Sequence, residues 1–87
     1  MTTVREERSF RGISRRMAVG YLENLGGRAA GDGVVEGDGW RADCREATVS
    51  VGPSLTLTEV SVTFEGDPER IDDLLPEFRR KAMRAGG

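Results

Sequence analysis

The stretch that decides the fold is LTLTEVSVTFEGDPERIDDLL, residues 55–75. Its first half, residues 55–65, is rich in Thr, Val and Leu, as is typical of a β-strand. Its second half opens with Asp67-Pro68-Glu69, which combines an N-cap acid, a proline at the first helical position and an acid in the first turn. The sequence therefore predicts a strand followed directly by a C-terminal helix.

The apolar residues before this strand change parity. Trp40, Ala42 and Cys44 alternate with charged residues, which predicts a strand with one face on the core and the other in water. The alternation resumes in the opposite parity at Val49, so we expect a turn or bulge around residues 45–48.

The parity also changes within the decisive strand, between Leu57 and Val60. A bulge near Thr58-Glu59 would keep both halves facing the core, and we expect one there. Gly52-Pro53-Ser54 supplies the turn that precedes the strand.

A first helix is predicted from the N-cap Ser14 to Gly26-Gly27, which can end it. Gly20 in its middle costs about 1 kcal/mol relative to alanine, so this glycine either marks a close helix contact or is simply tolerated. The apolar stripe of this helix consists of Met17, Ala18, Tyr21, Leu22 and Leu25.

The C-terminal helix carries a longer apolar stripe with a proline inside it. Pro76 lacks the backbone N–H that would bond to the carbonyl of Asp72, so we expect a kink or a break into two pieces. The stripe consists of Ile71, Leu74, Leu75, Phe78, Ala82 and Met83.

The remaining segments complete a sheet. Val4–Arg11 predicts a charged edge strand, and residues 28–36 predict a weak strand because Gly31 and Gly33 interrupt it. The order is then β-α-β-β-β-β-α. Tight turns imply antiparallel neighbours, so we predict one α+β domain over residues 1–87. Its expected architecture is a two-layer sandwich with four to five antiparallel strands covered on one face by two helices.

In element order, this arrangement is similar to one half of the TATA-binding protein fold and to small helix-grip domains. That similarity is one of topology and implies no activity.

The composition limits the functions that the protein can have. The chain has 87 residues, of which 37% are hydrophobic and 32% charged, so its core must be thin, and we expect self-association. The net charge of −2 disfavours nonspecific nucleic-acid binding but leaves it open. Because neither a membrane-spanning run nor a signal peptide is recognisable, we expect a cytoplasmic protein.

Few side chains could carry out chemistry. Histidine is absent and Cys44, in phase with the apolar face, is the single thiol, so we predict no catalytic residue, no cofactor and no metal site, and the protein is more consistent with a non-enzyme. Asp32, Glu36 and Asp38 lie among glycines, but their spacing indicates turns rather than a calcium loop.

Arg11, Arg15 and Arg16 surround the start of the first helix and are the candidate anion-binding residues. They could equally form a solvated face paired with nearby glutamates. A second basic cluster closes the C-terminal helix, where the helix dipole alone favours cations; it consists of Arg79, Arg80, Lys81 and Arg84.

Three stretches, residues 10–27, residues 36–40 and residues 55–60, resemble short proteins of halophilic archaea to which no activity is assigned. The resemblance spans nearly the whole chain and implies a cytoplasm rich in potassium chloride. Lys81 is the only lysine, which agrees with this expectation, whereas a net charge of −2 is less acidic than that group's pattern.

Two functions remain. The first is a non-enzymatic interaction module that forms a homodimer through a sheet edge or an uncovered sheet face. The alternative is a domain that binds a small anion or nucleic acid through Arg11, Arg15 and Arg16.

Overall fold

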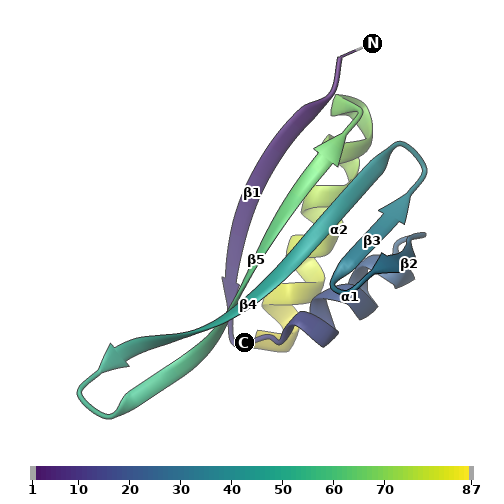
Figure 1. The fold of residues 1–87 in the computed structure, drawn as a ribbon. Coiled ribbons are helices and arrows are strands. Elements are labelled where there is room, and N and C mark those ends of the chain that lie inside the picture. The colour runs from purple at the N-terminus through teal and green to yellow at the C-terminus, as the bar shows by residue number, and fades with distance from the viewer. Residues whose placement is uncertain (1, 87) are drawn as a thin grey trace.

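The computed structural model describes residues 2–86, which form a five-stranded antiparallel sheet and two helices. The strands lie in the order β1-β5-β4-β3-β2, and both helices pack against the same face of the sheet (Figure 1). The elements are β1 (Val4–Arg11), α1 (Arg15–Asn24), β2 (Arg28–Gly31), β3 (Val34–Gly37), β4 (Trp40–Gly52), β5 (Leu55–Gly66) and α2 (Pro68–Gly86). The predicted α+β class and the order β-α-β-β-β-β-α are confirmed.

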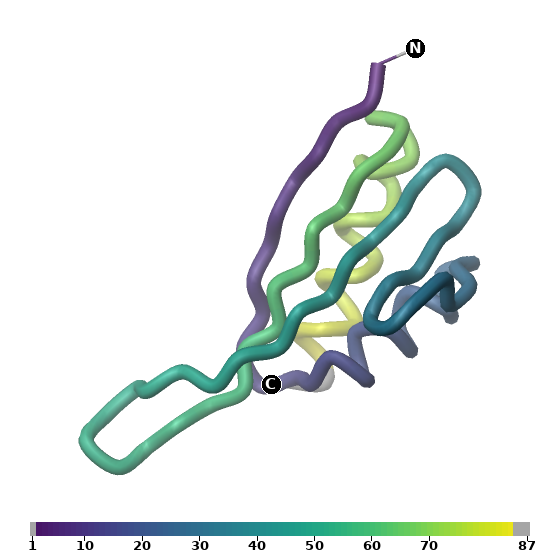
Figure 2. The backbone as a smooth tube through the Cα atoms, viewed as in Figure 1, coloured from purple at the N-terminus to yellow at the C-terminus, as the bar shows by residue number. Residues whose placement is uncertain are grey.

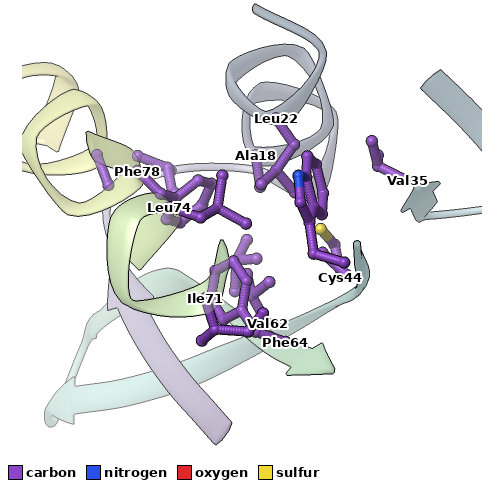
Figure 3. Packing of buried hydrophobic residues seen from close by; sticks show 14 residues of the cluster. Ala18, Leu22, Val35, Cys44, Val62, Phe64, Ile71, Leu74 and Phe78 are labelled. Carbon is purple, nitrogen blue, oxygen red and sulfur yellow. The ribbon is translucent and has the colours of Figure 1, made fainter. Parts of the chain in front are cut away.

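The hydrophobic core lies between the helices and the sheet (Figure 3). Phe78 of α2 is its centre, with edge-on contacts to the rings of Phe64 at 5.6 Å, Phe10 at 5.1 Å and Tyr21 at 6.2 Å. These contacts join α2 to α1, β1 and β5, so one aromatic cluster holds the two layers together.

The strand count agrees with the prediction, although the boundaries differ. Residues 28–36 are not one weak strand, because Gly33 takes a positive φ of 76° and the chain reverses there to form the β2–β3 hairpin. Residues 40–52 are one strand where two were expected.

Both predicted bulges are wrong. The β4–β5 register runs without a shift from Trp40 opposite Gly66 to Ser50 opposite Thr56. The irregularity lies farther along, between Ser50 and Gly52. The parity of the apolar residues changes because they move to the other face of the sheet, where the helix layer no longer covers the strands.

The helix boundaries follow the predicted signals. Ser14 caps α1 by accepting a hydrogen bond from the Met17 backbone N–H at 3.1 Å, and Gly26 beyond its end has a φ of 101°. Asp67 accepts from the Glu69 N–H at 3.0 Å at the start of α2. Pro76 does not break α2 into two pieces, since one helix runs through it.

Two stripe residues are not in the core. Met17 is 37% exposed and Met83 is 64% exposed. Ile13, ahead of α1 and outside the predicted stripe, is buried instead. Within the described part of the chain, neither helix has the length and apolarity needed to cross a membrane.

The molecule is elongated, with principal extents of 48 × 23 × 20 Å. The far ends of β4 and β5 extend past both helices as a twisted hairpin (Figure 2). We call residues 47–58, which form this projection, the arm.

Candidate functional site

The arm is the longest uncharged run in a highly charged chain. Its sequence, ATVSVGPSLTLT, contains no Asp, Glu, Lys or Arg, whereas 32% of all residues are charged. All of its residues are exposed except Val49 and Thr58, which are partly buried. A two-stranded hairpin with no helix over it is only marginally stable in water, so this arm is suited to being covered.

One face of the arm is apolar. The uninterrupted register places Val49 opposite Leu57, and Leu55 follows two residues from Leu57 on the same side. Leu55 is 58% exposed and Leu57 is 38% exposed. Because residues of this parity face away from the helices, the apolar patch continues the outer face of the sheet.

Elsewhere the outer face is covered with charge. Arg45 lies 3.8 Å from Asp43 there, and Thr63 donates to Glu7 at 3.5 Å. The charged residues that line this region are Arg5, Glu7, Arg41, Asp43, Arg45 and Glu65. The body of the sheet therefore presents a hydrated face, and the apolar patch is confined to the arm.

The edge of β4 along the arm has no strand beside it among residues 2–86. β3 reaches only to the pair Val34 and Asp43, and one further bond runs from the Cys44 N–H to the Gly33 carbonyl at 2.7 Å. On the other side, the Gly12 N–H donates to the Thr58 carbonyl at 2.9 Å, so β5 is covered up to the base of the arm.

These bonds fix which backbone groups point outward. Cys44 directs its N–H toward β3, and alternate residues of a regular strand direct their polar groups to the same side. The N–H and C=O groups of Glu46, Thr48 and Ser50 therefore point to the open edge of β4. A row of such groups is a template for another strand.

The predicted arginine cluster is largely paired with acids of the same chain. Arg11 Nε lies 3.1 Å from Glu59, and Arg15 lies 3.2 Å from Asp32. The Arg15 backbone N–H at the start of α1 donates to the Glu46 carboxylate at 2.7 Å. The positive end of this helix thus already binds a carboxylate, and anion binding by Arg11, Arg15 and Arg16 stays a prediction.

Two residues of the second basic cluster, Arg79 and Arg80, line a groove between β1 and α2. The groove measures about 680 Å³ and combines Phe10, Leu75, Pro76 and Met83 with Arg8, Ser9, Arg79 and Arg80. Arg8 pairs with Glu6 at 3.1 Å and Arg80 with Glu77 at 3.3 Å. Exposed pairs of this kind contribute little to stability. The groove therefore combines apolar side chains with charged side chains that are only weakly held.

Cys44 is buried, and its environment opposes ionisation. Burial raises the pKa of its thiol to about 11, Asp43 adds to the increase, and Arg15 acts in the opposite direction. Asp38, one of the acids considered for a calcium loop, instead lies 3.5 Å from Arg70. Residues 2–86 contain no group of three acidic or cysteine side chains able to hold a metal.

Sequence reasoning did not single out the arm, because it placed every apolar residue of these strands on the face of the sheet that covers the core. One signal in the sequence could have identified it: residues 47–58 carry no charge, whereas 32% of all residues are charged. Natural edge strands often carry charge that opposes pairing, as β1 does, and the arm lacks this protection.

A family model described as archaeal MoaD-like protein matches residues 6–87. No match was found among curated proteins. The family match supports the archaeal part of the resemblance seen in the sequence; the halophilic origin stays an expectation.

Proposed function

The chain belongs to the archaeal MoaD-like protein family, and we propose that it acts as a non-enzymatic interaction module that forms a homodimer through its arm. The family description names no reaction for this chain. The single observation that carries the proposal is the uncharged, exposed arm, with Val49, Leu55 and Leu57 on one face.

A second copy of the chain is the partner that fits best. The two arms in contact would bring no like charges together, because residues 47–58 are uncharged. Each arm offers the other both an open strand edge and an apolar face. Two hairpins side by side form a four-stranded unit, which satisfies the backbone groups that one arm leaves open.

Covering the arm also offsets the thin core. Leu55, Leu57 and Val51 are among the few large hydrophobic residues that lie exposed. Complete burial of such a side chain stabilises by about 1.5–3 kcal/mol, and covering the fraction still exposed here would contribute about half of that or less. Edge-to-edge pairing of two arms would shield part of this apolar surface from water and join the remainder into one shared patch.

Sedimentation equilibrium from low micromolar to near-millimolar protein tests the proposal, in physiological salt and in molar potassium chloride. We expect a species of twice the 9.5 kDa chain mass at the upper concentrations. Leu57→Lys should weaken the dimer several-fold, because it places a charge in the apolar patch that the two paired arms would share.

Thr56→Lys is the matched control, since it adds the same charge one residue away on the opposite face of the arm. We expect a smaller effect from it than from Leu57→Lys. A monomer at every concentration in both salts would refute self-association. Equal weakening by the two lysines would contradict the role of the apolar face.

A further inference from the structure

Resting on the proposed function, we infer that two copies join through the open edge of β4, antiparallel, with Thr48 opposite Thr48 of the second copy. The interface is then a continuous four-stranded arm in the order β5-β4-β4-β5.

The choice of β4 follows from the lengths of the two open edges. β3 leaves β4 after Cys44, so residues 45–52 have a free side among the described residues. β5 is covered by β1 and Gly12 up to Thr58, so its free side begins only beyond that residue. The β4 edge is the longer of the two and offers more backbone groups.

The register follows from the direction of the backbone groups. Glu46, Thr48 and Ser50 point outward, and residues that exchange both of their hydrogen bonds must lie directly opposite one another. In a two-fold symmetric pair, these three residues pair only with one another when Thr48 lies opposite Thr48 of the second copy and Glu46 lies opposite Ser50 of the second copy. A shift by two residues in one direction would place Glu46 opposite Gly52, in the irregular turn region. In the other direction it would place Ser50 opposite Cys44, whose N–H already donates to Gly33.

Side chains are compatible with this register. Arg45 comes opposite Val51 of the second copy, and Ala47 comes opposite Val49, so no like charges meet. Residues of one parity stay on one face across an antiparallel pair. The apolar patches of both arms therefore merge into one surface on the outer side of the paired hairpins.

Oxidative cross-linking of variants that each carry one introduced cysteine tests the register. Thr48→Cys should form a covalent dimer in high yield, because residues opposite each other in such a pair have Cα atoms about 5.5 Å apart, within the range of a disulfide. Val49→Cys, Ser50→Cys and Thr56→Cys should cross-link several-fold less. The unmodified protein, whose Cys44 is buried, is the background control.

A second variant tests the edge without cysteine. Thr48→Pro removes an N–H that points to the open edge and not to β5, so the fold should persist while the dimer is lost. Circular dichroism and thermal melting report the fold, and sedimentation reports the dimer.

The outcomes separate the two proposals. A dimer that cross-links best at Val49 or Thr56, or that survives Thr48→Pro with the fold intact, overturns the β4 register but leaves self-association standing. A monomer in sedimentation overturns both. Maximal cross-linking at Thr48 together with a folded, monomeric Thr48→Pro supports the inference.

Discussion

Cys44 combines a buried thiol with a neighbouring carboxylate. Both its burial and Asp43 oppose the thiolate, and its pKa of about 11 lies two units above the ordinary value of 9.0. The reactive thiolate is therefore about a hundredfold scarcer at neutral pH than for a free cysteine.

We expect thiol reagents to modify Cys44 at least a hundredfold more slowly in the native protein than in denaturant at pH 8. The pKa of the Cys44 thiol is higher in the folded protein than in the unfolded chain. Its contribution to the free energy of unfolding is therefore fully present below pH 9 and decreases as the pH rises from 9 toward 11. Reaction kinetics with a chromogenic disulfide measure the first effect. Equal rates in both states would show that the thiol is accessible.

Gly37 and Gly20 differ in the space around them. A Cβ at Gly37 would overlap the indole of Trp40, whereas a Cβ at Gly20 would have nothing within 4 Å. Gly20 is thus tolerated and marks no close helix contact, which settles the alternative left open by the sequence.

Alanine at these two positions should shift stability in opposite directions. Gly37→Ala should destabilise the protein by about 1–3 kcal/mol through overpacking, and Gly20→Ala should stabilise it by up to about 1 kcal/mol through helix propensity. Urea denaturation measures both. A neutral Gly37→Ala would mean that the indole moves aside at no cost.

At the scale of elements, the start of α1 depends on a residue from β4. The Glu46 carboxylate accepts from the Arg15 N–H at 2.7 Å and lies at the positive end of the helix dipole. Together with Ser14, it supplies acceptors for two of the backbone N–H groups that a helix start leaves free.

Glu46→Ala should therefore lower stability by about 0.5–1 kcal/mol, with the loss reduced at high salt. Glu23→Ala, near the other end of α1, is the control and should leave stability unchanged or slightly higher because an acid is unfavourable there. Thermal melts of both variants in low and molar salt make the comparison. An unchanged Glu46→Ala would show that Ser14 suffices as the cap.

For the whole molecule, the sequence was sufficient for the element order, the helix caps and the central core, since these depend on local signals and periodicity. Ser14, Asp67 and Phe78 lie where the pattern predicted. The same reasoning placed Val49 and Leu57 on the core side, because it assumed that every apolar residue faces the helices.

That assumption failed because the extent of the helix layer is a tertiary property. The length by which β4 and β5 exceed the helices cannot be obtained from either strand alone, and only the absence of charge over residues 47–58 signals it. The Arg15 pairing with Asp32 likewise joins residues far apart along the chain, so spacing could not predict it.

The pairing of β1 with β5 also bears on how the chain folds. Arg11 lies beside Glu59 and Val4 beside Gly66, so β1 can join only after most of the intervening chain has been brought together. The β4–β5 hairpin, closed by a short turn, has far less loop entropy to overcome. We therefore expect the hairpin that ends in the arm to form early in folding and the N-terminal strand to join the sheet last.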